Sequence, residues 1–160
     1  MSEQRVGIGY DTHRTSAVRT LVLGGVELPG TPGLHGFSDS DVLAHAVIDA
    51  VLGAAALGDI GRLFPDTDPQ YENADSIELL REVAGRAAAE GWRVVNVDAT
   101  VIAEEPRISP YAAEMAARLA DALGVEAGHV SIKGTTNEGM GFIGRGEGIG
   151  TIAVALLERA

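Results

Sequence analysis

The sequence contains no cysteine. Disulfides, thiolate catalysis, thiolate zinc sites and iron–sulfur clusters are therefore all excluded. Any bound metal ion must be held by histidine, aspartate or glutamate side chains.

Basic residues and long apolar runs are scarce. Lys and Arg number 12 against 23 Asp and Glu, which gives a net charge of −11. Phosphate contact needs clustered cations, so nucleic acid and anionic membranes are poor general partners. The N-terminus MSEQRVGIGY lacks the apolar core of a signal peptide, and no apolar run approaches the length of a membrane span. We therefore expect a cytoplasmic protein that binds neither nucleic acid nor membrane.

Hydrophobic residues make up 46% of the 160 residues. This length and composition are typical of one domain, and residues 1–160 are predicted to share a single core.

The clearest predicted helix lies between Ser38 and Gly58. Ser38, followed three residues later by Asp41, is a capping-box pattern, and Gly58 is a typical stop. Asp41, His45 and Asp49 are spaced four apart and share a helix face. An imidazole between two carboxylates could be oriented as a metal ligand. On this helix alone, however, a partly exposed histidine in a solvated ion-pair row is the favoured interpretation.

Residues 5–10 alternate apolar and small side chains, which predicts a strand. Asp11 and His13 come at its end. Residues two apart on an extended chain point to the same side, so the two side chains could hold one ligand together. Taken alone, such a pair is more typical of a strand-end turn than of a metal site.

The remaining pattern predicts an α+β fold. The expected elements are a hairpin at residues 21–28 that turns at Gly24-Gly25, a mobile loop at 29–37, an acidic surface turn at 59–69, helices at 76–90 and 111–123, and strands at 95–101, 130–133 and 149–157. This order favours a mixed β-sheet packed against about three helices on one side, with a βαβαββ-like core and an extra N-terminal hairpin.

Residues 134–150, GTTNEGMGFIGRGEGIG, form a glycine-rich stretch between the last two predicted strands. Glycines let backbone N–H groups converge on an anion, threonine hydroxyls add donors, and Arg145 could clamp phosphate. Glycines also build irregular turns, so this stretch alone leaves phosphate binding and a plain turn equally open.

Asp11, His13 and His45 together offer one carboxylate and two imidazoles. These ligands could hold a tetrahedral Zn²⁺ with one position open to a ligand oxygen. The same ligand types could hold Fe(II) as a facial triad. The glycine-rich stretch favours phosphate chemistry over oxygen activation.

Five stretches of the chain resemble motifs of the 2-C-methyl-D-erythritol 2,4-cyclodiphosphate synthase family, enzymes of the non-mevalonate isoprenoid pathway. The resemblance extends from Val6 to Leu157. The matching stretches, in order and spacing, are Gly9-Tyr10-Asp11-Thr12-His13, Ser38-Asp39 with Asp41 and His45, Leu57-Gly58-Asp59-Ile60-Gly61, Phe64-Pro65-Asp66-Thr67-Asp68-Pro69 and Gly144-Arg145-Gly146-Glu147-Gly148.

This resemblance implies a set of ligands and a homotrimer with active sites between adjacent subunits. Zinc would bind to Asp11, His13 and His45, and Mg²⁺ or Mn²⁺ near Glu138 would bridge the substrate's α- and β-phosphates. The resemblance also implies ligand binding at Phe142 and Arg145, the latter near the threefold axis where an isoprenoid diphosphate can sit. The other implied substrate-binding residues are Thr12, Phe37, Ser38 and Asn137, with Asp59, Ile60, Gly61, Phe64, Pro65, Asp66, Thr67 and Asp68 near the methylerythritol part and Ala103, Glu104, Glu105, Pro106, Arg107, Ile108, Ser109, Thr135 and Thr136 near the cytidine diphosphate.

The implied reaction is an intramolecular phosphoryl transfer. The 2-phosphate oxygen of 4-diphosphocytidyl-2-C-methyl-D-erythritol 2-phosphate would attack the β-phosphorus, and CMP would leave, with Thr136 stabilising the transition state by a hydrogen bond. No protein nucleophile is needed, because the enzyme's task is to bring the two phosphates into line and to offset their repulsion.

Phe37 departs from the family pattern, which has histidine at this position before Ser38-Asp39. The family histidine is regarded as positioning the substrate phosphate, whereas phenylalanine can neither donate a hydrogen bond nor carry charge. His35 lies two residues upstream and could take this role. Two other functions stay open: a metal-dependent phosphohydrolase that uses the same ligands, and a non-catalytic trimer that binds isoprenoid diphosphate.

Overall fold

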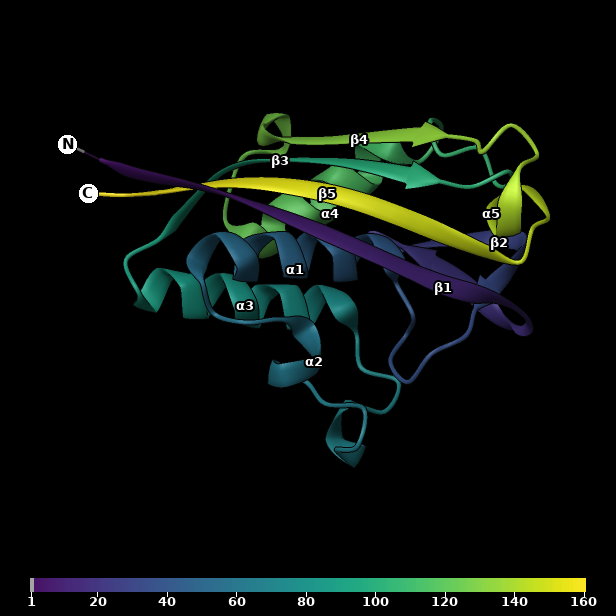
Figure 1. The fold of residues 1–160 in the computed structure, drawn as a ribbon, viewed down its shortest axis with the longest axis horizontal. Helices are drawn as coiled ribbons and strands as arrows, with labels where there is room; N and C mark the ends of the chain where they lie inside the picture. The colour runs from purple at the N-terminus through teal and green to yellow at the C-terminus, as the bar shows by residue number, and fades with distance from the viewer. Residues whose placement is uncertain (1) are drawn as a thin grey trace.

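A five-stranded sheet forms the middle of the molecule, which the computed structural model describes over residues 2–160 (Figure 1). The strand order is β2-β1-β5-β3-β4. β3 and β4 are parallel, and the other neighbours are antiparallel. The mixed sheet of the predicted α+β class is thus confirmed. The strands are β1 (Glu3–Leu23), β2 (Val26–Leu34), β3 (Arg93–Ile102), β4 (Val130–Thr135) and β5 (Gly148–Arg159).

Three longer helices cover one side of this sheet (Figure 1). They are α1 (Val42–Ala55), α3 (Ser76–Ala89) and α4 (Ala112–Leu123), and the packing on one side agrees with the prediction. No helix within residues 2–160 has both the length and the apolar character needed to cross a bilayer. The shorter helices are α2 (Ile60–Leu63), α5 (Gly141–Gly144) and the 3₁₀ turns η1 (Pro69–Tyr71) and η2 (Ala127–His129).

Two glycines of β1 allow α1 to lie directly on the strand. A Cβ on Gly9 would come 1.8 Å from the carbonyl oxygen of Ala46, and one on Gly7 would come 1.9 Å from another backbone oxygen of α1. Side chains alternate along a strand, so Asp11 and His13 point to the same side as these glycines, toward the helices. Any larger residue at either glycine would push the helix away from both side chains.

Within residues 2–160 no helix covers the opposite face of the sheet, and the part of this face formed by β1 and β5 is apolar. We call it the outer sheet face and define it by exposed residues of β1 and β5: Val6, Ile8, Tyr10, Ile152 and Val154. Ile8 is 69% exposed, although isoleucine is usually buried. Contiguous apolar patches of this kind mark interaction surfaces.

The two chain ends lie side by side at one end of the sheet (Figure 1). Glu3 pairs with Arg159 in the β1–β5 ladder and also accepts a hydrogen bond from its guanidinium. The guanidiniums of Arg5 and Arg159 stack on the Trp92 ring at 4.7 and 4.4 Å from its centroid. Cation–π contacts thereby join both ends of the chain to the start of β3.

The N-terminal hairpin is longer than predicted. β1 continues past the predicted end at Tyr10 to Leu23, and β2 reaches Leu34, so much of the expected mobile loop at 29–37 is strand. β2 tolerates Pro32 because it lies at the edge of the sheet, where a missing N–H costs no ladder bond. The predicted turn at Gly24-Gly25 is confirmed.

The start of α1 differs from the predicted capping box. Asp41, not Ser38, caps the helix, and its carboxylate accepts from the N–H of Ala44 at 2.9 Å. The same carboxylate accepts from the N–H groups of Gly24 and Gly25 at 2.9 and 2.7 Å. One buried side chain therefore joins the hairpin turn to the helix start.

The other end of α1 also differs from the prediction. Ala56, in the left-handed region with φ 58°, ends the helix two residues before Gly58. Its N–H bonds the carbonyls of Leu52 and Gly53, which satisfies the free end of the helix without a glycine. Asp75 caps α3 and Gly124 ends α4, and both helices lie within the predicted ranges 76–90 and 111–123.

We expect Asp41→Asn to change how stability depends on pH. Burial, and then the charge of Asp39, raise the pKa of Asp41 from 3.8 to about 6, against the pull of its N–H bonds. The folded state then binds this proton more tightly than the unfolded state. The contribution of Asp41 to the free energy of unfolding is therefore full below pH 3.8 and is lost as pH rises through about 6. The free energy of unfolding of the parent should fall relative to Asp41→Asn by about 1 kcal/mol between about pH 5 and pH 7. Chemical denaturation of both proteins checks this, and a constant difference between them contradicts it.

Candidate metal centre and active site

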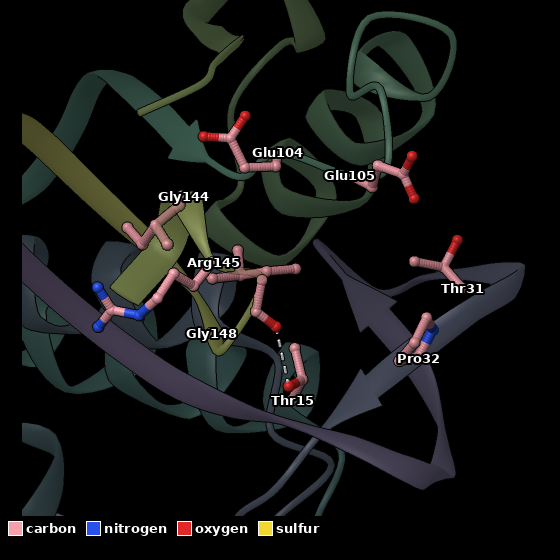
Figure 2. A pocket seen from close by; sticks show the side chains of 11 residues that line it. Thr15, Thr31, Pro32, Glu104, Glu105, Gly144, Arg145 and Gly148 are labelled. Carbon is pink, nitrogen blue, oxygen red and sulfur yellow. Dashed lines mark hydrogen bonds between the residues drawn. The ribbon is translucent and has the colours of Figure 1, made fainter. Parts of the chain in front are cut away.

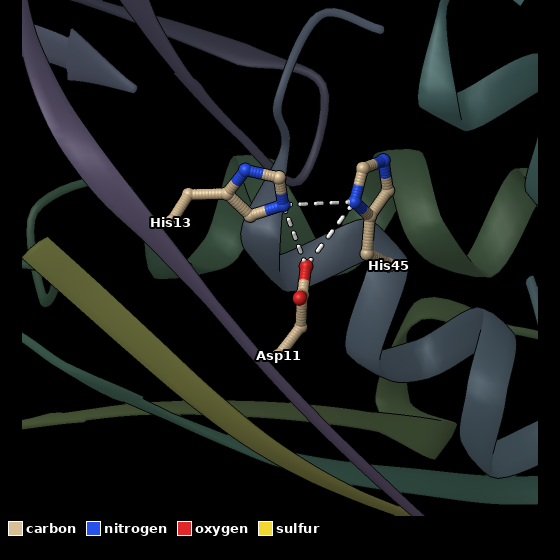
Figure 3. Close-up of side chains that lie close together, drawn as sticks. All are labelled: Asp11, His13 and His45. Carbon is tan, nitrogen blue, oxygen red and sulfur yellow. Dashed lines mark hydrogen bonds and ion pairs between the residues drawn. The ribbon is translucent and has the colours of Figure 1, made fainter. Parts of the chain in front are cut away.

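Asp11, His13 and His45 bring three ligand atoms together (Figure 3). His13 Nε2 lies 2.9 Å from Asp11 Oδ2, and His45 Nδ1 lies 3.1 Å from the same oxygen. The two ring nitrogens are 3.3 Å apart. β1 supplies the first two side chains and α1 supplies the third, as the contact through the β1 glycines requires. The predicted convergence of these residues is confirmed.

The hydrogen bonds of His13 show which ring nitrogen faces the cluster with a lone pair. His13 Nδ1 is 2.8 Å from the backbone carbonyl oxygen of His35. A carbonyl only accepts, so Nδ1–H donates to it and a neutral ring presents a free lone pair at Nε2. This arrangement is typical of a metal-binding histidine.

Charge interactions within the cluster shift two pKa values. Burial raises the pKa of Asp11, but its contacts with the His13 and His45 rings outweigh burial and leave that pKa below its ordinary value. Burial lowers the pKa of His13, but the hydrogen bond and charge of Asp11 outweigh it and raise that pKa. Without a metal ion, a proton shared among these groups relieves the crowding of three acceptors.

The spacing of the three ligand atoms fits a single ion. With bonds of about 2.0–2.1 Å, adjacent ligand atoms of a tetrahedral zinc site lie about 3.3 Å apart. Adjacent ligands of an octahedral iron site with similar bonds lie about 3.0 Å apart. The observed separations of 2.9, 3.1 and 3.3 Å accommodate either ion.

His45 does not lie in a solvated row between Asp41 and Asp49, so the interpretation favoured for this helix alone is wrong. The residue is only 8% exposed, because it points toward β1 and α3. Asp41 caps α1, and Asp49 accepts a hydrogen bond from the N–H of Ile60 at 2.8 Å. Asp49 thus connects α2 to α1 and does not orient the imidazole of His45.

A cavity of about 440 Å³ opens beside the metal triad, the name we use for Asp11, His13 and His45. Four of the five motif stretches contribute lining residues, which places the 9–13, 38–45, 57–61 and 64–69 regions around one space. Tyr71, Leu79 and His35, which the sequence did not single out as a group, also line it. The predicted site residues around this cavity are Phe37, Ser38, Ile60, Gly61, Phe64 and Asp66.

The residues predicted to surround cytidine diphosphate line a different cavity, of about 390 Å³. They lie at the ends of β3 and β4, away from α1. The predicted residues in this second cavity are Ala103, Glu104, Pro106, Arg107, Ile108, Ser109, Thr135 and Thr136. One chain therefore does not bring the two halves of the predicted site into one cavity.

The loop after β4 is held by Glu104. Its carboxylate accepts from the N–H groups of Asn137 and Gly139 at 3.1 and 3.0 Å. Glu138 lies between them with φ 53°, is exposed, and its N–H donates to Thr136 Oγ1. The loop thus presents the Glu138 carboxylate to solvent from an ordered backbone.

Arg145 lies at a third cavity, of about 480 Å³ (Figure 2). Its guanidinium is on the opposite side of this space from Thr31 and pairs with Glu147 at 3.0 Å. Thr15 donates to the carbonyl of Gly146 and ties the glycine-rich stretch to β1. An anion at Arg145 would compete with an existing ion pair.

Ser76 is the contact that sequence reasoning missed. Its hydroxyl lies 2.8 Å from His45 Nε2, on the side of the ring away from the triad. No chemistry was expected in α3, because serine at the first position of a helix is typical of helix starts. Ser76 is 0% exposed. This burial is the feature that points to a role, and the neighbouring residues in the sequence do not reveal it.

Comparison with known proteins places the chain in a family. The model of the YgbB family matches residues 4–158. A relative from Syntrophomonas wolfei, named 2-C-methyl-D-erythritol 2,4-cyclodiphosphate synthase, is 56% identical over 98% of this chain and 99% of its own length. A relative from Anaeromyxobacter sp., named bifunctional enzyme IspD/IspF, is 60% identical over 96% of this chain. The chain spans only 40% of that longer protein.

A solved structure shows the same fold. It is the IspF of Plasmodium falciparum in complex with CDP, which aligns with a TM-score of 0.86 and 32% identity over 98% of this chain and 96% of its own. The sequence match, the fold and the convergence of the metal triad agree. The chain belongs to the YgbB family, the family of 2-C-methyl-D-erythritol 2,4-cyclodiphosphate synthase.

Proposed function

We propose that this protein converts 4-diphosphocytidyl-2-C-methyl-D-erythritol 2-phosphate to 2-C-methyl-D-erythritol 2,4-cyclodiphosphate and CMP. The convergence of Asp11, His13 and His45 beside a cavity lined by residues of four motif stretches carries this proposal. The names of relatives that match over nearly their whole length support it. The CDP complex of the Plasmodium falciparum protein supports a cytidine nucleotide as part of the ligand.

The reaction needs two phosphates of one molecule to meet. An oxygen of the 2-phosphate bonds to the β-phosphorus, and the bond from that phosphorus to the CMP oxygen breaks, so CMP leaves with the electron pair. A zinc ion on the metal triad and Mg²⁺ or Mn²⁺ near Glu138 would supply positive charge that offsets phosphate repulsion.

The chain's own residues bind and orient the substrate in this proposal. Ile60, Gly61 and Phe64 would enclose the methylerythritol part and exclude water. At the other cavity Thr135 and Thr136 present exposed hydroxyls, and the Thr136 hydroxyl would donate to a phosphate oxygen as charge develops.

We infer that the working assembly is a homotrimer whose active sites lie between subunits. Two observations support this. The outer sheet face is an exposed apolar surface in the single chain, and the two halves of the predicted site line separate cavities. The second cavity of one copy would complete the first cavity of its neighbour. An isoprenoid diphosphate would bind near the threefold axis, at Phe142 and Arg145.

Incubation of the purified protein with zinc, Mg²⁺ and the proposed substrate tests the function. CMP and the cyclic product should form together, in equal amounts. A phosphohydrolase would instead insert labelled solvent oxygen into its product, and a non-catalytic binder would release no CMP. Either result would overturn the proposed reaction.

We expect His35 to supply the hydrogen-bond donor that Phe37 lacks. Both residues line the cavity beside the metal triad, and the backbone carbonyl of His35 accepts a hydrogen bond from His13. His35→Ala keeps that carbonyl and should lower kcat at least about tenfold, because one donor to a developing oxyanion is worth about 2–4 kcal/mol.

The matched variants are Phe37→His alone and in the His35→Ala background. Phe37→His alone should give little gain in kcat, whereas the double variant should recover most of the lost activity. Parent-like kcat in His35→Ala, or a large gain in Phe37→His alone, contradicts this role for His35.

A further inference from the structure

The ring of His45 makes contacts at both nitrogens. Nδ1 faces the metal triad, whereas Nε2 faces two hydroxyls, Ser76 Oγ at 2.8 Å and Ser38 Oγ at 3.1 Å. A metal-binding histidine must leave its ligating nitrogen without a proton, so the opposite nitrogen has to carry it. Which partner of Nε2 enforces this depends on the direction of its hydrogen bonds.

Ser76 can only accept from His45, because its own proton is already used. Ser76 Oγ lies 2.5 Å from Asp39 Oδ1, and an ionised carboxylate accepts only. The serine proton therefore points to Asp39, and its lone pair points to the ring. His45 must then donate from Nε2, which leaves a lone pair on Nδ1.

Ser38 imposes no such direction. Its hydroxyl oxygen accepts from the N–H of Ser40 at 3.2 Å, and its own proton remains free to point at the ring. Ser38 could therefore pair with either tautomer of His45. Only the connection through Ser76 selects one.

We propose that Asp39 and Ser76 form a hydrogen-bond relay that holds His45 as a metal ligand. Backbone hydrogen bonds fix the position of the Asp39 carboxylate, which also accepts from the N–H groups of Ser76 and Asp41 at 2.9 and 3.1 Å. The two residues act through His45 and are positioning residues. This proposal deepens the proposed function, since it concerns the same metal triad.

Zinc affinity of Ser76→Ala tests the relay. We expect the dissociation constant for zinc, measured on the full chain by competition with a chromophoric chelator, to rise about 10- to 100-fold, as when other hydrogen-bond partners of metal-bound histidines are removed. Ser76→Thr keeps the hydroxyl and should restore most of the affinity. Asp39→Asn should cause part of the loss, because an amide can donate to Ser76 and reverse the direction of its bond.

Asp75→Ala is the matched control. Asp75 caps the same helix turn by accepting from the N–H of Ile77, but it does not contact His45. This variant should weaken the helix start and keep the parental zinc affinity.

Equal zinc affinity in Ser76→Ala and the parent overturns the relay. So does an equal loss in Asp75→Ala, or a parent that binds no zinc. The readout does not depend on catalysis. Relay-dependent zinc binding without CMP release would preserve this proposal and overturn the proposed reaction instead.

Discussion

His45→Ala should lower CMP release by about a thousandfold, because loss of a metal ion removes several kcal/mol of charge stabilisation where two phosphates meet. The side chain supplies one of three converging ligand atoms, and the remaining pair, Asp11 and His13, is left with open positions that water would fill. The purified variant should therefore also contain far less zinc than the parent. Measured CMP release and metal content check both results.

His129→Ala is the control for this substitution. His129 is an exposed histidine of η2, outside the cavity beside the metal triad. Its removal should leave zinc content and CMP release at parental levels. If His45→Ala kept a tenth of the activity or its full zinc content, the metal triad would not be the centre of the reaction.

Ile8→Asp should dissociate the proposed homotrimer and abolish most activity. Ile8 lies in the middle of the outer sheet face, and its exposure of 69% applies to the single chain. A carboxylate buried in an apolar interface cannot be solvated or paired, so the assembled state loses several kcal/mol per chain. Light scattering should give the mass of one chain. CMP release should fall at least about a hundredfold, because neither cavity is completed by a neighbour.

The control for Ile8→Asp is a variant that places the same charge on the helix side of the sheet. Ala117→Asp adds a carboxylate at an exposed position of α4, on the side of the sheet opposite to Ile8. It should leave the mass and the activity unchanged. A trimeric and active Ile8→Asp would contradict the proposed interface, and a monomeric Ile8→Asp with full activity would contradict the sharing of active sites.

Sequence reasoning could predict the parts of the site that follow local rules. Asp11 and His13 lie two apart on a strand, so their common direction follows from backbone geometry alone. The hairpin turn at Gly24-Gly25 and the cap of α3 at Asp75 follow from turn and capping preferences in the same way. These features depend on few neighbours in the chain.

The burial of His45 could not be predicted from its helix. It depends on the contact of α1 with β1, which Gly7 and Gly9 permit and which joins segments far apart in the sequence. Helical periodicity placed His45 beside Asp41 and Asp49, and both carboxylates instead bind backbone N–H groups. Helical periodicity assigns a polar residue to the solvent-facing side of a helix, whereas His45 is covered by β1 and α3.

The extent of the N-terminal hairpin also depends on tertiary context. Prolines and glycines at residues 29–37 are typical of a loop, but the edge position of β2 accepts them as strand. The role of Ser76 is hidden for a related reason. Its position at a helix start already explains a serine, so only the fold shows that the hydroxyl meets His45.

The adjacent chain ends have a consequence for topology. Glu3 and Arg159 are ladder partners, and paired strands lie only about 5 Å apart. A few glycines would bridge this gap, so a circular permutant with new ends cut in the exposed segment 126–128 should keep every strand register and the metal triad. The chemistry at the metal triad would then be independent of how the chain connects the first and last strands.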